Sequence, residues 1–131
     1  MAKVLIADDT DRDVSHLTSL LKQNGHEVIR ALCSVDAQRE IVAGQADCAV
    51  YDGSLPRYTD MQDISSEWGA AFLARESRRR RPEMPCIVYT HGISNQEHIQ
   101  TLRDLNVPIF IKEYEDFSVM FKRLGLPEIR K

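Results

Sequence analysis

The chain has 131 residues, enough for one ordinary domain built around a single hydrophobic core. Apolar residues make up 43% of it and charged residues 28%, which excludes a disordered chain, a collagen-like repeat and a disulfide-dense mini-protein. The net charge of −3 argues against a domain that mainly covers phosphates, so we do not expect nucleic acid as a partner. The apolar stretch after Lys3 is too short for a signal peptide or a membrane span, which predicts a cytoplasmic protein without membrane contact.

Short β-branched runs alternate with helical patterns along the sequence. The strand candidates, in chain order, are residues 4–7, 27–32, 47–51, 86–90 and 107–111. Apolar residues recur at helical spacing after each strand: Val14, Leu17, Leu20 and Leu21; Ala37, Ile41 and Val42; Ile64, Trp68, Ala71 and Phe72; Ile99, Leu102 and Leu105; Phe117, Met120, Phe121 and Leu124. Such alternation predicts an α/β fold with right-handed crossovers, in which helices cover both faces of a parallel sheet. Ligands then bind beyond the carboxyl ends of the strands.

Two other groups of residues indicate structure rather than chemistry. Cys33, Cys48 and Cys86 lack the spacing of metal ligands, and the last two lie in apolar runs, where a thiol acts as a small hydrophobic group. We expect all three to be inert. The arginine run at residues 78–81 closes the third predicted helix, where positive charge interacts favourably with the helix dipole. We expect these arginines to form a solvated face.

Polar side chains that can bind a metal ion or take part in a reaction lie at the ends of four of the five predicted strands. They are Asp8 and Asp9 after the first strand, Asp52 after the third, Thr90 at the end of the fourth and Lys112 after the fifth. Because parallel strands end at one edge of a sheet, these side chains should converge, and three close carboxylates repel one another unless a hard cation such as Mg²⁺ binds there. Mg²⁺, a lysine and a threonine hydroxyl are together suited to hold a phosphoryl group. Asp52 would be the nucleophile that takes this group as an acyl phosphate.

An acidic pair, a lone aspartate, a threonine and a lysine, each after its own apolar strand and in this order, resemble the receiver domain of two-component response regulators. The resemblance rests on Asp8-Asp9, Asp52, Thr90 and Lys112, and it spans nearly the whole chain. It implies a flavodoxin-like receiver fold, with a doubly wound sheet of five parallel strands in the order 2-1-3-4-5. It also implies that residues 1–131 form a single receiver domain.

The resemblance assigns a role to each residue of the acidic cluster. It implies that Asp52 is the phosphoacceptor and that Asp9 binds Mg²⁺ directly, while Asp8 reaches the ion through water. The main-chain carbonyl of Ser54 would be a further ligand of the ion.

The resemblance also implies protein partners. The phosphoryl donor would be a phosphohistidine on a sensor histidine kinase or a histidine phosphotransfer protein, and an unknown downstream protein target would bind the phosphorylated form. Thr90 would shift toward the phosphoryl group after transfer, and Lys112 would pair with it. Such a chain is a signalling domain and not an enzyme, because it catalyses only its own phosphoryl transfer and slow dephosphorylation.

Two segments depart from the family pattern. The stretch from Asp52 to Thr90 is longer than usual, and we place the excess at residues 57–66, as a candidate partner-recognition or lid element beside the phosphorylation site. Receivers normally carry Lys-Pro with a cis bond where this chain has Lys112-Glu113. Because a cis bond before a non-proline residue costs about 3 kcal/mol, we expect this peptide to be trans.

Three further positions concern switching and access to the phosphoryl group. Ile109 stands where the family often has an aromatic residue that reorients with the threonine, and His91 replaces a small residue. In the family, the positions of Ser54 and Gly92 flank the path of an attacking water, and neither side chain can position a water strongly. We therefore expect slow self-hydrolysis, with His91 narrowing the entrance.

Two other functions compete with this interpretation. Glu113, Ile109 and the longer loop are compatible with a degenerate receiver that acts as a phosphorylation-independent interaction module, although all five pocket residues are retained. A hydrolase of the haloacid dehalogenase type also begins with an aspartate after a first strand and uses Mg²⁺, but its motif requires Thr or Val where this chain has Asp13. Whether the chain is a stand-alone receiver or a piece of a longer regulator or hybrid kinase stays open at this point.

Overall fold

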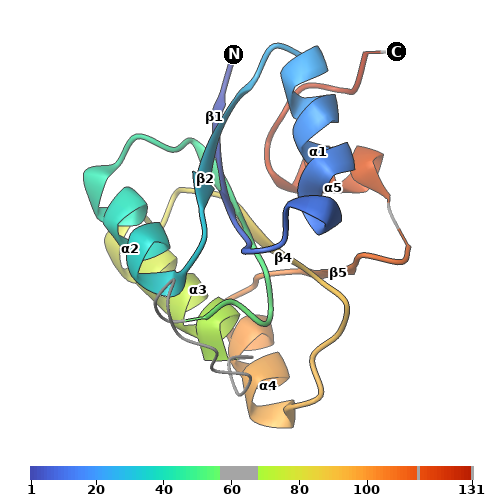
Figure 1. Ribbon diagram of the computed structural model, residues 1–131. Coiled ribbons are helices and arrows are strands. Elements are labelled where there is room, and N and C mark those ends of the chain that lie inside the picture. Colours follow the sequence, from blue (N-terminus) through green and yellow to red (C-terminus); the bar gives the residue numbers. More distant parts are fainter. Residues whose placement is uncertain (57–67, 115, 131) are drawn as a thin grey trace.

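A five-stranded parallel sheet organises the computed structural model, which describes residues 1–56, 68–114 and 116–130 (Figure 1). Its strands are β1 (Lys3–Ala7), β2 (Glu27–Ala31), β3 (Cys48–Tyr51), β4 (Cys86–Thr90) and β5 (Ile109–Ile111). Their order is β2-β1-β3-β4-β5, as the resemblance to receiver domains implied. Ala7 pairs with Ala31 on one side and Tyr51 on the other, so these three strands end together.

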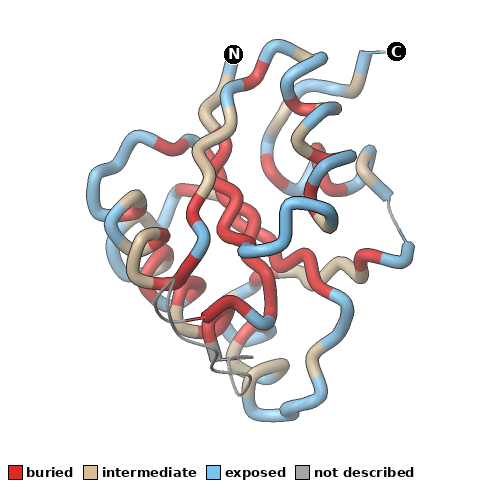
Figure 2. Tube along the Cα trace, viewed as in Figure 1, coloured by how far each residue is buried: buried red, intermediate tan, exposed pale blue. Residues whose placement is uncertain are grey.

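Helices pack against both faces of the sheet. They are α1 (Asp11–Gln23), α2 (Ser34–Ala43), α3 (Trp68–Arg80), α4 (Gln96–Asp104) and α5 (Phe117–Arg123). Helices α1 and α5 cover one face, and α2, α3 and α4 cover the other (Figure 1). Alternate strand residues point to opposite faces, so Val4 and Ile6 pack with α1 and α5, whereas Leu5 packs with the other three helices. Buried residues are accordingly concentrated in the central strands, between the two layers of helices (Figure 2). None of the helices within the described ranges is long and apolar enough to cross a membrane.

Two details of these elements differ from the prediction. Strand β5 begins at Ile109 and not at residue 107, because the chain before it is still completing the turn after α4. In that turn Asn106 has a φ of 56°, and the N–H of Val107 donates to the carbonyl of Leu102 at 2.9 Å. The helical spacing of Val42 predicted that it packs in the core, but on α2 this residue is 56% exposed.

The segment that precedes α3 holds several of the predicted features. The lengthened loop at residues 57–66, Ile64 within it and the side chain of Trp68 lie outside the described residues, so those expectations stay predictions. The first turn of α3 packs closely on the chain after β3. A Cβ atom at Gly69 would lie 2.9 Å from the carbonyl oxygen of Leu55, which leaves no room for a larger residue at this position.

The arginine run at the end of α3 is only partly the solvated face that we expected. Arg78 is half-buried and donates hydrogen bonds to three main-chain carbonyl oxygens, those of Met84, Leu105 and Asn106, at 3.1, 2.9 and 3.3 Å. Arg81 hydrogen-bonds the carbonyl of Ala46. Carbonyl groups in turns need donors, and a guanidinium with five N–H groups reaches several of them at once. Arg79 and Arg80 are exposed, as expected.

The cysteines behave as the sequence predicted. Cys33, Cys48 and Cys86 are all buried and none forms a disulfide. Burial raises the pKa of the Cys48 thiol to about 12 and also raises the pKa of Cys86. These two thiols therefore stay protonated and act as core side chains.

His26 ties the start of the chain to the core. Its Nδ1 accepts a hydrogen bond from the N–H of Ala2 at 3.1 Å, and its ring meets the ring of Phe121 edge-on, with centroids 6.1 Å apart. Burial, followed by the positive N-terminus, lowers the pKa of His26. The unfolded chain therefore binds this proton more readily than the folded chain does. The stability that His26 contributes is present above about pH 6.5 and is lost as the pH falls through the lowered pKa.

We expect the substitution His26→Asn to weaken this acid sensitivity. The amide oxygen of asparagine can accept the hydrogen bond from Ala2, but asparagine does not titrate. Between about pH 7 and about pH 5, the unchanged chain should lose more unfolding free energy than the variant in urea titrations. The exposed His16→Asn variant is the matched control and should follow the unchanged chain. If His26→Asn follows it as well, the assignment is wrong.

Candidate functional site

The carboxyl edge of the sheet holds polar side chains that are buried: Asp8, Asp52, Thr90 and Lys112. The parallel hydrogen-bond ladder continues past the strand ends and fixes the main chain there. The N–H of Asp8 donates to the carbonyl of Ala31 at 3.0 Å, and that of Asp52 donates to the carbonyl of Ala7 at 2.9 Å. The N–H of Lys112 donates to the carbonyl of Thr90 at 2.8 Å. The sheet itself, and not a separate loop structure, therefore brings these residues together.

Asp9 completes an acidic cluster with Asp8 and Asp52. One carboxylate oxygen from each residue lies within 4.8 Å of the others, and Asp9 is the exposed member. Burial, followed by the charge of Asp8, raises the pKa of Asp52 to about 6, and burial raises the pKa of Asp8. A cation bound between these carboxylates would stabilise their ionised forms, which burial and mutual repulsion otherwise disfavour. The oxygen-only donor set fits a hard divalent ion such as Mg²⁺.

Lys112 connects the cluster to α1. Its Nζ donates to three carboxylates: Asp8 at 2.8 Å, Asp13 at 3.1 Å and Asp52 at 3.5 Å. Burial disfavours its charge, but the hydrogen bond to Asp8 and the charges of Asp52 and Asp8 outweigh this and raise the pKa of Lys112. The buried ammonium therefore stays charged beside Asp52.

Arg30 on β2 holds the chain that carries the acidic pair. Its Nε and Nη2 donate to the main-chain carbonyl of Asp8 at 2.8 and 2.6 Å, and its Nη1 pairs with Asp11 at 2.8 Å. The N–H of Thr10 also donates to Asp8 Oδ1 at 2.9 Å. Arg30 was not among the predicted site residues, because a charged residue within a strand is equally well explained as a solvent-facing side chain.

Thr90 lies against the chain that follows Asp52. Its Oγ1 is 3.3 Å from both the carbonyl oxygen and the amide nitrogen of Gly92. A Cβ atom at Gly53 would lie 2.7 Å from Thr90 Oγ1 and 3.2 Å from Thr90 Cβ. The hydroxyl can therefore occupy this place only because residue 53 has no side chain.

We expect Gly53→Ala to displace Thr90 and to destabilise the fold by about 1–3 kcal/mol, the usual cost of inserting a methyl group into packed structure. Denaturant titration measures the loss, and the displacement should appear as shifted NMR resonances of Thr90. Gly92→Ala is the matched control, because a Cβ atom there would meet nothing within 4 Å. We expect that control to change stability by less than about 0.5 kcal/mol. Equal effects of the two substitutions would contradict the packing argument.

A polar hollow of about 170 Å³ opens beside Lys112. It is lined by Arg12, Asp13, His16, His91, Lys112 and Glu113. His91 Nε2 lies 3.0 Å from Asp13 Oδ2, and His91 Nδ1 hydrogen-bonds Glu113. Asp13 was not among the predicted site residues, because an acid in the first turn of a helix is well explained by the helix dipole alone.

The remaining predicted positions lie around the same edge. Ser54 is exposed, and its main-chain N–H hydrogen-bonds the Asp52 carboxylate and lowers the pKa of Asp52 slightly against the larger effect of burial. Ile109, at the start of β5, is partly buried and packs against the core on the side of α2, α3 and α4. The peptide between Lys112 and Glu113 is trans, which confirms the prediction.

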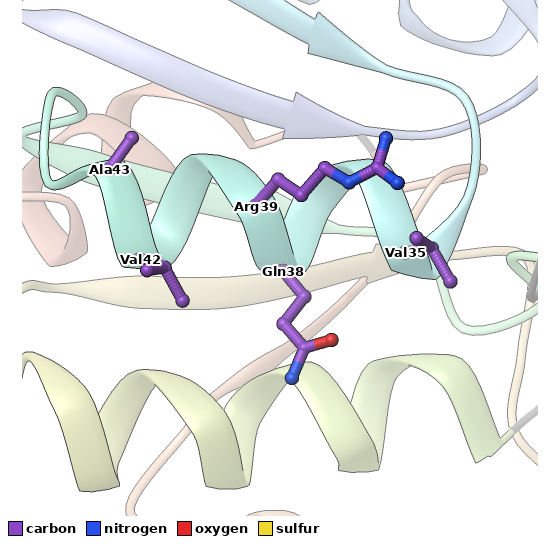
Figure 3. A pocket seen from close by; sticks show the side chains of 5 residues that line it. All are labelled: Val35, Gln38, Arg39, Val42 and Ala43. Carbon is purple, nitrogen blue, oxygen red and sulfur yellow. The ribbon is translucent and has the colours of Figure 1, made fainter.

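Two larger hollows lie away from the strand ends. One, of about 330 Å³, is lined only by residues of α2: Val35, Gln38, Arg39, Val42 and Ala43 (Figure 3). Gln38 points toward α3, where its amide donates to Glu76 at 2.6 Å (Figure 3). The other, also of about 330 Å³, lies where α1 meets α5 and is lined by His16, Ser19, Leu20, Gln23 and Phe117. Neither gathers carboxylates, so the candidate site is the one at the carboxyl edge of the sheet.

Many solved structures resemble this chain, although neither a protein-family profile nor a curated protein sequence matches it. A response regulator receiver domain protein (CheY-like) from Methanospirillum hungatei is 22% identical, with a TM-score of 0.73 over 93% of this chain and 90% of its own. The non-phosphorylated HemR receiver domain from Leptospira biflexa is 17% identical, with a TM-score of 0.75 over 100% of both chains. The response regulator TrrA from Thermotoga maritima, solved with Mg²⁺ and BeF, is 18% identical, with a TM-score of 0.70 over 95% of this chain and 97% of its own.

The chain therefore has the receiver fold of response regulators. Its strand order and helix placement match that flavodoxin-like architecture. Within this fold, an acidic cluster, a buried lysine and a buried threonine meet at the carboxyl edge of the sheet.

Proposed function

We propose that this chain is a phosphoacceptor receiver in two-component signalling, in which Asp52 takes a phosphoryl group from a histidine of a partner protein. The observation that supports this most is the acidic cluster within 4.8 Å together with Lys112 Nζ at 3.5 Å from Asp52. A metal site needs no buried lysine, and a simple ion pair needs no cluster of three carboxylates. Phosphoryl transfer benefits from both, because the charge of the group in transit is then compensated from two sides.

Mg²⁺ is the cofactor of this proposal. Asp9 and Asp52 would bind it directly, Asp8 through water, and the main-chain carbonyl of Ser54 would be a further ligand. The donor set fits, since it consists of oxygens only and since a cation would relieve the raised pKa values of Asp8 and Asp52. When bound, the ion would neutralise charge on the phosphoryl oxygens.

The chain's own residues would perform the transfer in one displacement. An ionised oxygen of Asp52 attacks phosphorus, a new P–O bond forms, and the bond from phosphorus to the donor's imidazole nitrogen breaks with its electron pair left on nitrogen. Lys112 holds one phosphoryl oxygen, and the hydroxyl of Thr90 shifts toward another. Burial of Asp52 and Lys112 strengthens these interactions by excluding water from the pocket.

The proposed partners follow from this chemistry. The donor is a phosphohistidine of a sensor histidine kinase or a histidine phosphotransfer protein, and a downstream protein binds the phosphorylated form. The chain acts in the cytoplasm as a signalling domain and not as an enzyme, because the only reactions it promotes are those of its own Asp52.

Phosphorylation by acetyl phosphate, read by intact-protein mass spectrometry, tests the proposal. We expect one phosphoryl adduct that requires Mg²⁺ and that is absent from the Asp52→Asn variant. Asp36→Asn, which alters a partly exposed aspartate on α2, is the matched control and should be phosphorylated normally. No adduct with Mg²⁺ and donor, or an equal adduct in Asp52→Asn, would favour the degenerate receiver instead.

The lifetime of the adduct is a separate expectation. Ser54 and Gly92 offer no amide or carboxylate to orient a water against the acyl phosphate, so we expect hydrolysis to be slow. Gly92→Gln supplies an amide that can orient a water, in open space where a Cβ atom meets nothing within 4 Å, and should shorten the lifetime. We expect a change of about tenfold, which corresponds to about 1.4 kcal/mol in the barrier to hydrolysis. Loss of the adduct over time, followed by mass spectrometry, measures this, and an unchanged lifetime in the variant would contradict it.

A further inference from the structure

His91 joins three segments at the mouth of the pocket. It directly follows Thr90, its Nε2 lies 3.0 Å from Asp13 Oδ2 on α1, and its Nδ1 hydrogen-bonds Glu113 in the chain after β5. Its side chain is 60% exposed, so this arrangement is held by polar contacts and not by packing. The family pattern has a small residue in place of His91 and a proline in place of Glu113, so both departures meet in one contact.

Both contacts require a charged imidazole ring. A carboxylate oxygen can only accept a hydrogen bond, so each ring nitrogen must donate, and only the doubly protonated ring does this. The hydrogen bond with Glu113 raises the pKa of His91, burial opposes the rise, and the contact with Asp13 adds to it. The geometry and the charges therefore favour the same protonated form.

The carboxylate of Asp13 is shared between His91 and Lys112. Oδ2 of Asp13 lies 3.0 Å from His91 Nε2 and 3.1 Å from Lys112 Nζ, so two cations compete for one oxygen. Because both donors are cations, they repel each other across the shared oxygen, and each weakens the hold of Asp13 on the other. The strength with which Asp13 holds Lys112 therefore depends on whether His91 carries its second proton.

We propose that His91 is a positioning residue for phosphoryl transfer, because its charged ring draws Asp13 away from Lys112 and leaves the ammonium to the phosphoryl group on Asp52. This inference rests on the proposed function of the site. Neutral His91 would release Asp13 to Lys112, and the carboxylate would then compete with the phosphoryl oxygens for the same N–H groups.

Deprotonation of His91 also makes the entrance of the pocket more negative, which opposes phosphorylation as well. The charged or titratable groups that face His91 in the hollow are Arg12, Asp13, His16, Lys112 and Glu113. Loss of the proton from His91 leaves Asp13 and Glu113 without its compensation, and an anionic donor then meets one more negative charge. Phosphorylation should therefore slow as the pH rises through the raised pKa of His91.

A titration of His91 by NMR tests the link to Lys112. Beryllofluoride, a mimic of the phosphoryl group, is added with Mg²⁺, and the imidazole resonances are followed against pH with Mg²⁺ alone as the reference. If the mimic engages Lys112, Asp13 turns to His91, so the proton affinity of His91 should rise by about fivefold, the low end of ordinary coupling between sites. In Asp13→Asn this rise should disappear, whereas a through-space effect of the anion would persist.

Phosphorylation rates give a second readout. With acetyl phosphate and Mg²⁺, the rate ratio of the unchanged chain to His91→Gln should fall by about fivefold between about pH 6 and about pH 9. Titration of the donor and of Asp52 affects both proteins alike and cancels in this ratio. His16→Gln lines the same hollow and is the matched control, so it should keep the pH dependence of the unchanged chain.

The outcomes separate this inference from the proposed function. If beryllofluoride binds and Asp52 is phosphorylated, but the titration of His91 does not respond or responds equally in Asp13→Asn, His91 is not a positioning residue. If neither beryllofluoride nor acetyl phosphate reacts, the proposed function fails. The titration of His91 in Asp13→Asn without any ligand then still decides the contact, since an unchanged pKa would show that Asp13 does not act on His91.

Discussion

The Asp52→Asn variant is expected to unfold less readily than the unchanged chain at neutral pH without Mg²⁺. The pKa of Asp52 is raised from its ordinary value of 3.8 to about 6, because burial and the charge of Asp8 disfavour the ionised form. This difference corresponds to about 3 kcal/mol that the ionised carboxylate costs the folded state above about pH 6. Asparagine removes the charge and should restore about that amount of unfolding free energy.

The pH dependence fixes the sign of this expectation. A raised pKa means that the folded chain binds the Asp52 proton more tightly than the unfolded chain does, so the unchanged chain loses stability as the pH rises from about 4 to about 6. The gain from Asp52→Asn should be close to zero at about pH 4 and complete above about pH 6. Urea titrations of both proteins at several pH values measure this. A variant that is less stable at neutral pH would contradict the electrostatic account, and Mg²⁺ should reduce the difference by favouring the ionised form.

Lys112→Gln is expected to destabilise the fold by about 3–5 kcal/mol, as removal of one partner from a buried ion pair typically does. The ammonium contacts Asp8, Asp13 and Asp52, and its side chain is only 4% exposed. Without it, the carboxylates must take up protons or repel one another. The loss should therefore be largest at alkaline pH and should shrink as the pH falls.

Two comparisons make this expectation specific. Lys22→Gln changes an exposed lysine at the end of α1 and should alter stability by less than about 0.5 kcal/mol. The double substitution Lys112→Gln with Asp52→Asn removes the lysine together with one of its carboxylates. Asp52→Asn should therefore stabilise the Lys112→Gln variant by clearly more than it stabilises the unchanged chain. Additive effects would mean that Lys112 and Asp52 do not interact.

The parallel sheet and the convergence of the pocket could be predicted because both follow from rules that act along the chain. Alternating strand and helix patterns predict a parallel sheet with right-handed crossovers, whereas the order of its five strands followed from the resemblance to receiver domains. A residue that directly follows a buried strand must lie at the edge of the sheet, whatever the helices around it do. Asp8, Asp52 and Lys112 lie there for this reason.

Contacts between surface elements could not be predicted in the same way. Asp13 and Lys112 are separated by 99 positions, and neither the helix pattern of the first nor the strand pattern of the second indicates the other. Arg30 and Arg78 look like solvent-facing residues in sequence, but their long side chains reach main-chain carbonyl groups of distant segments. Glu113 could be noticed only as a missing proline, since its contact with His91 depends on how two loops approach each other.

The hydrogen bonds of Arg78 have a mechanical consequence for the opposite end of the sheet. Arg78 links the turn before β4 to the turn before β5, through the carbonyl groups of Met84 and of Leu105 and Asn106. Both strands are therefore clamped at their entry, while Thr90 and Lys112 stand at their exit. At that exit the N–H of Lys112 donates to the carbonyl of Thr90 at 2.8 Å, so the two main chains are held to each other there as well. A shift of either side chain toward a group on Asp52 is therefore expected as a rotation about its own side-chain bonds, on a main chain that stays in register.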